Sequence, residues 1–213
     1  MMIKEIYPNI HCVYALNSRT LASTFLRPQE YYESPKYKDK IFTLKEYRKW
    51  FKKSNDEDTF TYYSSYVGFN VPDFAFEPFL EGKFNPLTAN EKIIINYVSN
   101  LTAPYYIIGV CIADIRFVGH LKHETAHALW YLNSNYRKYM LKQISQLPAN
   151  LIIKLQRKLK KHGYHKKMYK DEIHAYMVDT SNSAYIDLPE VKRIKKYYDK
   201  TYYKDIIITE DII

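Results

Sequence analysis

The sequence predicts an α+β fold, with a small mixed sheet in the N-terminal half and helices in the C-terminal half. The longest strand-like runs of aromatic and β-branched residues precede residue 114, whereas most segments after it have helical patterns. Five glycines in 213 residues are too few for a large sandwich of tight hairpins. The length suits one domain, which we expect to have a β-containing lobe of about residues 1–115 and a helical lobe of about residues 116–213.

The first 53 residues predict one strand and two helices. The run IHCVYAL within residues 1–17 is β-like, and residues 20–25 favour a short helix that stops at Pro28. Residues 27–40 are polar and rich in tyrosine, which is typical of a connection. Apolar side chains on one side of residues 43–53 predict an amphipathic helix.

Residues 60–71 are rich in aromatic and β-branched residues and predict a strand. Two prolines bracket the segment 73–80, which we expect to be irregular. The pattern Thr88-Ala-Asn-Glu91 is a capping box and predicts a helix that ends near residue 100. The apolar run 105–113 has the length and composition of a buried strand.

After residue 133 the sequence predicts several helices. Ser134 is the expected N-cap of the first, Pro148 suits the first turn of the second, and Gly163 suits the second helix's C-terminal cap. Residues 206–208 favour a last strand or a tail. The expected helices cover residues 135–146, 149–161, 171–178 and 188–198.

The net charge of +9 favours acidic partners, such as nucleic acid, an anionic membrane face or an acidic protein. Basic residues concentrate in 152–170 and 192–204, which we interpret as solvated helix faces. No nucleic-acid-binding motif accompanies them. Cys12 and Cys111 are too few for a disulfide framework or a cysteine-based zinc site.

The N-terminus lacks the apolar segment of a signal peptide, and no stretch approaches 18 apolar residues. We therefore expect a cytoplasmic protein without a transmembrane segment. Export as an effector or toxin, by a route that needs no cleaved signal, stays open.

The most informative stretch is His123-Glu124-Thr125-Ala126-His127, an HExxH motif. On a helix, two histidines four residues apart share one face, so both imidazoles can reach one zinc ion. Glu124 then lies beside the open coordination position. Zinc lowers the pKa of its bound water, and the glutamate accepts the proton as that water attacks a carbonyl. The spacing thus predicts amide hydrolysis.

A catalytic zinc ion needs a third protein ligand. The continuation HExxHxxGxxH is absent, because Trp130 and Asn133 occupy the glycine and final histidine positions. The best alternative is Glu172, on an expected helix 45 residues after His127. Tyr176 lies four residues after Glu172 on the same face, together with Asp179.

This arrangement resembles the gluzincins, the thermolysin-like zinc peptidases with HExxH on one helix and a glutamate on a later one. The resemblance covers two short segments. It implies a zincin-like fold and a zinc site of His123, His127 and Glu172, with Glu124 as the general base. Many gluzincins carry an aspartate four residues after the ligand glutamate, where this sequence has Tyr176. The residue that orients His123 is therefore open.

Other residues compete for these roles. Asp171 and His120 are alternative third ligands, since Asp171 adjoins Glu172 and His120 lies on the helix face of His123. His174 should point away from Glu172. Tyr176 is the expected hydrogen-bond donor to an oxyanion, with Tyr185 as a weaker alternative.

The sequence therefore predicts a zinc metallopeptidase that acts on a protein or peptide substrate, which the net charge suggests is acidic. By resemblance, a strand of the N-terminal half, 60–71 or 105–113, would bind the substrate backbone by strand addition. The alternative function is a non-catalytic zincin-like module that docks an acidic protein or nucleic acid through 152–170 and 192–204. A pure scaffold does not need Glu124, which weighs against this alternative. Deformylation is disfavoured, because Cys111 lacks the sequence context of a deformylase ligand.

Overall fold

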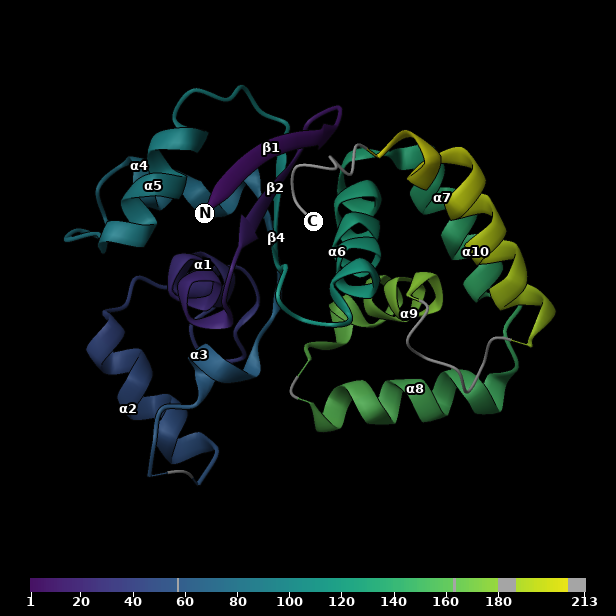
Figure 1. Cartoon of the computed structure of the whole chain (residues 1–213). Coiled ribbons are helices and arrows are strands. Elements are labelled where there is room, and N and C mark those ends of the chain that lie inside the picture. The colour runs from purple at the N-terminus through teal and green to yellow at the C-terminus, as the bar shows by residue number, and fades with distance from the viewer. Residues whose placement is uncertain (57, 163, 180–186, 207–213) are drawn as a thin grey trace.

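A computed structural model of the chain describes residues 1–56, 58–162, 164–179 and 187–206 (Figure 1). The fold is α+β, as predicted, with a four-stranded sheet in the order β1-β2-β4-β3. β2 and β4 are parallel, whereas β1–β2 and β3–β4 are antiparallel, so the sheet is mixed. The strands are β1 (Met2–Tyr7), β2 (Ile10–Ala15), β3 (Gly68–Pro72) and β4 (Tyr106–Cys111).

The β-like run near the N-terminus forms the second strand of a hairpin. Asn9 adopts a φ of 63° at the turn, and its backbone N–H donates to Glu5 Oε1 at 2.8 Å. Asparagine tolerates this left-handed conformation better than most residues. The hairpin places β2 next to β4, which comes almost a hundred residues later.

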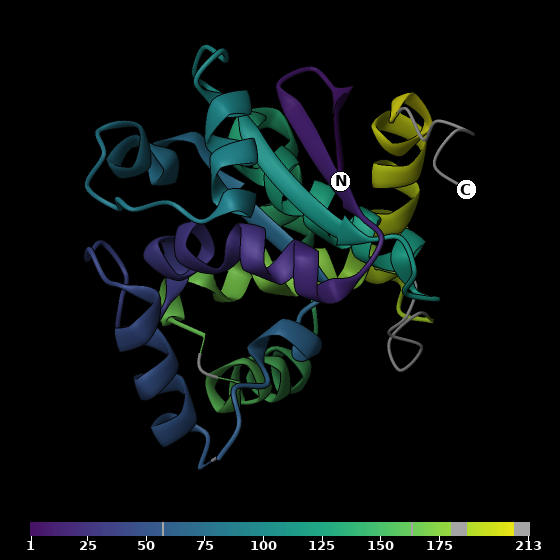
Figure 2. The ribbon, with the colours of Figure 1, turned by 60° about the vertical axis from the view of Figure 1, so that its left-hand side comes forward.

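Helix α1 (Ser18–Glu33) is longer than predicted, because it continues through Pro28. A proline inside a helix costs about 3 kcal/mol, but here the helix buries one face against the sheet. Gly109 in β4 permits this contact, since a Cβ atom there would lie only 2.5 Å from Phe25 Cε2. The buried guanidinium of Arg27 also pairs with Glu91 of α5 (Ala89–Val98). Helix α1 lies along one face of the sheet (Figure 2), and this tertiary packing overrides the proline signal.

The amphipathic helix predicted over 43–53 and the helix predicted after Thr88 are both present. α2 (Leu44–Ser54) begins at Thr43 with a capping box to Glu46, and α5 (Ala89–Val98) begins at Thr88 with one to Glu91. Each box satisfies backbone N–H groups that the first turn leaves unpaired.

The predicted strand 60–71 is correct only at its C-terminal end. The helical turn α3 (Tyr62–Ser65) precedes β3, because Tyr62 is 1% exposed in an aromatic cluster with Tyr47 and Phe51. Residues 73–80 are not irregular. They form a 3₁₀ helix (Asp73–Phe76) and the short helix α4 (Glu77–Leu80).

The C-terminal half is helical, as predicted. Asn133 rather than Ser134 caps α7, since its side chain accepts from two backbone N–H groups at 3.0 Å. A 3₁₀ turn (Tyr203–Asp205) precedes Ile206, while residues 207–208 and Gly163 lie outside the described residues. The helices are α6 (Phe117–Leu132), α7 (Ser134–Ile144), α8 (Ala149–Lys161), α9 (Tyr169–Val178) and α10 (Pro189–Thr201), with a 3₁₀ turn at Lys166–Met168.

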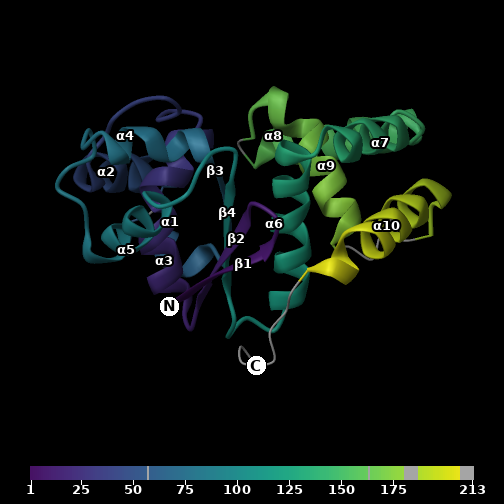
Figure 3. The same ribbon diagram turned by 90° about the horizontal axis from the view of Figure 1, so that it is seen from above.

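The sheet lies between helices α1 to α5 on one side and α6 to α10 on the other (Figure 3). A hydrophobic core is buried on each side. Alternate side chains of β4 face opposite sides, so that Ile108 and Val110 pack against the helices α6 to α10, whereas Ile107 packs against α1 to α5. Helix α6 and the edge strand β3 lie close together, and this junction positions the candidate site. Within the described part of the chain, no helix is both long and apolar enough to cross a membrane.

Candidate metal centre

The HExxH motif lies in the middle of α6, and its two histidines face each other as the helical spacing requires. The Nε2 atoms of His123 and His127 are 3.2 Å apart. His127 is 1% exposed, and the side chain of His123 is 13% exposed. Two imidazoles held this closely in a buried position can direct their lone pairs to one cation.

Helix α9 packs against α6 and brings Glu172 to these histidines. Glu172 Oε1 lies 3.6 Å from His127 Nε2, and Glu172 Oε2 lies 3.9 Å from His123 Nε2. One ligand atom from each of the three residues falls within 4.8 Å of the others, and they are the only such group of His, Cys, Asp and Glu in the described ranges. Glu172 is 2% exposed, and its Oε2 has no hydrogen-bond partner. A buried carboxylate oxygen without a partner is costly, and a bound cation would satisfy it.

Asp171, the nearest alternative ligand, contacts the opposite edge of the ring. Its Oδ1 accepts a hydrogen bond from His127 Nδ1 at 2.8 Å. On the other side of the ring, Nε2 of His127 is directed toward His123 and Glu172. Asp171 is therefore placed to orient a ligand rather than to serve as one.

The other two histidines of these helices lie outside the cluster. His120 Nε2 lies 3.7 Å from Asp114 Oδ1, away from Glu172, so the structure does not support His120 as the third ligand. His174 points away from Glu172, as expected. Its Nε2 donates to the Ala126 carbonyl at 3.2 Å, and its ring stacks on Trp130 at 4.6 Å.

The electrostatic field at this point favours positive charge. Burial lowers the pKa of His127, but the carboxylates of Asp171 and Glu172 outweigh burial and raise it to about 10. Burial and the adjacent His127 hold the pKa of His123 well below its usual value. The centre thus accommodates positive charge and keeps one imidazole neutral, and both properties suit a divalent cation. The donor set of two imidazoles and a carboxylate is the one that zinc takes in hydrolases.

Glu124 is buried between α6 and β3 beside the three candidate ligands. Its Oε2 accepts a hydrogen bond from Asn70 Nδ2 at 2.9 Å. Gly68 leaves room for Oε1, because a Cβ atom there would lie 2.4 Å from it. Burial raises the pKa of Glu124 to about 7, which is in the range suited to a general base at neutral pH.

The partners of Glu124 come from segments in which the sequence analysis found no site residue. Asn70 Oδ1 accepts from the Tyr106 hydroxyl at 2.8 Å, and the Asn70 backbone N–H donates to Gln29 Oε1 at 3.1 Å. Gln29 Nε2 in turn donates to Glu33 Oε1 at 2.7 Å. This chain of hydrogen bonds links α1, β3 and α6. No local sequence signal marks it, since Asn70 and Tyr106 lie within aromatic or apolar runs. Gln29 and Glu33 lie in a polar stretch without a recognisable motif.

Two tyrosines lie close to the centre. The ring of Tyr176 makes an edge contact with His123 at 4.9 Å, and burial raises its pKa to about 12, so its hydroxyl remains a donor. Tyr164, which precedes α9, also lines the cavity. Asp179 does not line the cavity and lies against Gly119, contrary to the expected shared face. Tyr185 lies outside the described residues.

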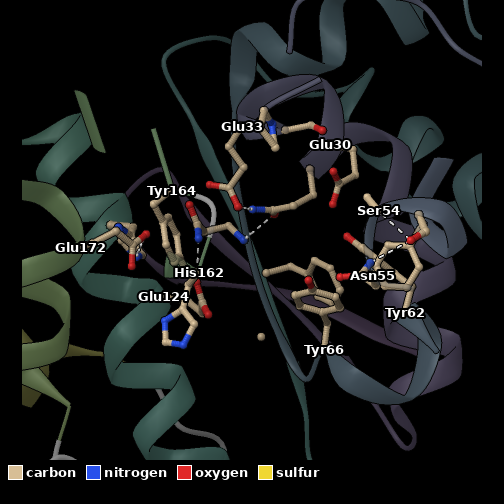
Figure 4. A pocket seen from close by; sticks show the side chains of 18 of the residues that line it. Glu30, Glu33, Ser54, Asn55, Tyr62, Tyr66, Glu124, His162, Tyr164 and Glu172 are labelled. Atoms are coloured by element: carbon tan, nitrogen blue, oxygen red, sulfur yellow. Dashed lines mark hydrogen bonds and ion pairs between the residues drawn. The ribbon is translucent and has the colours of Figure 1, made fainter. Parts of the chain in front are cut away.

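These groups open into a cavity of about 670 Å³ between the two halves of the chain (Figure 4). Residues of α6 and α9 line one wall together with Tyr164. Residues of α1, α2, α3 and β3 line the other. A cavity of this size accommodates several side chains of a peptide.

β3 is the strand that borders the cavity, because β4 is central in the sheet. Of the two candidate strands for substrate binding, 60–71 and 105–113, only the first therefore contributes an edge strand. The Asn70 N–H on that edge is already bonded to Gln29. A substrate strand that used this donor would displace Gln29.

Comparison of the chain with protein-family models, curated proteins and solved structures finds no match.

Proposed function

We propose that this chain is a zinc metallopeptidase with a gluzincin-like centre. The observation that carries the proposal is the meeting of His123, His127 and Glu172 around a buried, unpartnered carboxylate oxygen. Glu124 lies beside them in a cavity of about 670 Å³, which is large enough for a peptide. A chance HExxH sequence would need neither the third ligand nor the cavity.

In this proposal His123, His127 and Glu172 hold the zinc ion. Bound zinc would supply Lewis acidity, which polarises a substrate carbonyl and makes a water molecule more acidic. Glu124 accepts the proton of the attacking water and returns it to the leaving amine. Asn70 holds Glu124 in place through the hydrogen bond to its Oε2. Asp171 fixes the ring orientation of His127.

Tyr176 is the proposed donor to the oxyanion that develops on the carbonyl oxygen. It lies beside His123 and keeps its proton at neutral pH, because its pKa is raised to about 12. Tyr176→Phe should then lower kcat without loss of zinc. If Tyr176→Phe lowered zinc content instead, the tyrosine would be a structural neighbour of the centre.

The first test is the zinc content of the purified chain after zinc is supplied. We expect about one zinc per chain, lost in His123→Ala and reduced in Glu172→Ala. His165→Ala is the matched control, because His165 is exposed and outside the cluster. An unmutated chain that binds no zinc would refute the proposal and favour a basic binding protein.

Hydrolysis is tested separately with a peptide library and mass spectrometry. Glu124→Gln should keep zinc and lose cleavage by about a hundredfold or more. Cleavage that survives this substitution would assign the proton transfer to another group.

A further inference from the structure

The cavity beside the candidate centre is acidic, although the whole chain carries a net charge of +9. Among the described residues that line it, four are glutamates and one is a lysine, Lys161, which is exposed. Glu124 and Glu172 belong to the centre, where a divalent cation would balance their charge. Glu30 and Glu33 are left without such a counter-charge.

Glu30 and Glu33 lie in the last turn of α1 and extend into the cavity opposite Glu172 and Tyr164 (Figure 4). Gln29 holds one oxygen of Glu33 through the hydrogen bond at 2.7 Å. The C-terminal end of a helix carries partial negative charge, so this end of α1 disfavours carboxylates and favours a cation.

Within the described residues neither carboxylate is paired with a lysine or an arginine, and the charged group that lowers the pKa of Glu33 is His127, a proposed zinc ligand. Burial raises the pKa of each to about 7, and the nearby carboxylates Glu33 and Glu124 add to the effect. Neither lysine nor arginine is among the groups that shift these values most. A pair of partly buried acids in this position costs stability, and such costs are typical of residues retained for binding.

The wall around Glu30 is aromatic, which limits the kind of cation that fits. A long aliphatic stem that ends in a positive charge packs on such rings and gains cation–π attraction. A carboxylate side chain of a substrate would lie against these rings and would be repelled by Glu30 and Glu33. The rings that line this part of the cavity belong to Tyr47, Trp50, Phe51, Tyr62, Tyr66 and Phe69.

We propose that Glu30 and Glu33, with the aromatic wall, form a subsite for a lysine or arginine side chain of the peptide substrate. This subsite predicts a basic substrate, whereas net charge alone suggests an acidic one. The inference rests on the proposed function, because it names the substrate class of the same cavity. The basic outer surface and the acidic cavity then have separate roles.

Binding is measured first, on the zinc-loaded Glu124→Gln chain, so that cleavage does not interfere. The probes are fluorescein-labelled decapeptides of lysine and of glutamate, followed by fluorescence anisotropy. Non-specific attraction to a chain of charge +9 favours the glutamate peptide. Tighter binding of the lysine peptide therefore reports the cavity.

We expect the lysine peptide to bind about tenfold more tightly than the glutamate peptide. Replacing Glu30 and Glu33 together by glutamine should remove that preference, since each loses a charge-assisted contact. Glu77→Gln is the matched control, because Glu77 is exposed and outside the cavity. Glu33→Gln alone serves as the second variant if the double substitution impairs folding. Equal binding of the two peptides, or an equal effect of Glu77→Gln, would overturn the inference.

Cleavage of a peptide library by the unmutated, zinc-loaded chain separates this inference from the proposed function. Lysine or arginine enriched near the cleaved bonds, and no longer enriched after substitution of Glu30 and Glu33, supports both. Cleavage without such enrichment overturns the subsite and leaves the peptidase. Binding preference for the lysine peptide without any cleavage overturns the peptidase and leaves a cavity that binds cationic peptides.

Discussion

Replacing Asp171 by asparagine tests whether this residue orients a metal ligand. The asparagine oxygen can still accept from His127 Nδ1, now 2.8 Å from Asp171 Oδ1, so the geometry should survive and only the charge is lost. A hydrogen bond to a charged group contributes about 1.5–3 kcal/mol, against about 1 kcal/mol for a neutral pair. The difference of about 0.5–2 kcal/mol predicts a zinc affinity reduced about two- to thirtyfold.

The affinity is measured by competition with a chromogenic zinc chelator at pH 7.5, together with thermal unfolding of the metal-free chain. Glu172→Gln is the comparison, because it removes a proposed ligand and should weaken zinc binding more than Asp171→Asn does. An unchanged affinity in Asp171→Asn would refute the orienting role. A larger loss in Asp171→Asn than in Glu172→Gln would make Asp171 the third ligand.

Three further predictions concern the surroundings of the centre. Gly68→Ala would place a Cβ atom 2.4 Å from Glu124 Oε1, so zinc content should be retained while kcat falls at least about tenfold; unchanged kcat would contradict the role of this contact. Arg27→Met leaves the buried Glu91 carboxylate unpaired and should cost about 3–5 kcal/mol of unfolding free energy in urea denaturation, whereas a loss below about 1 kcal/mol would show that Glu91 finds other partners. The pKa of the Glu30 carboxyl is raised from 4.5 to about 7 in the folded chain. The stability associated with this protonated carboxyl is therefore fully present below pH 4.5, and the free energy of unfolding falls as the pH rises through 7. Glu30→Gln should therefore raise the melting temperature at pH 8 and not at pH 4, and an equal shift at both values would contradict this assignment.

The sequence by itself determined the elements whose signals are local. The capping box at Thr88 acts within one helical turn, so its helix begins where the pattern predicts. The spacing of His123 and His127 places both on one face of any α-helix. The apolar run 105–113 had to be buried, and it became the central strand β4.

Tertiary structure decided what depends on distant partners. Pro28 should end a helix, but burial of α1 against the sheet extends the helix to Glu33 and so brings that carboxylate to the cavity. Asp171 and Glu172 are adjacent in sequence, and successive residues of a helix point about 100° apart. The docking of α9 on α6 therefore decides which carboxylate faces the Nε2 atoms of the histidines and which one accepts the hydrogen bond from His127 Nδ1.

The charge of the cavity is the clearest case. Net charge sums over the whole chain and favours an acidic partner, whereas binding depends on the few groups that face the ligand. The parallel pairing of β2 with β4 and the packing of α1 bring Glu30, Glu33 and Asn70 to Glu124. These residues lie 54 to 94 positions before Glu124, beyond the reach of any local pattern. They meet it only when both sides of the sheet bury their apolar faces.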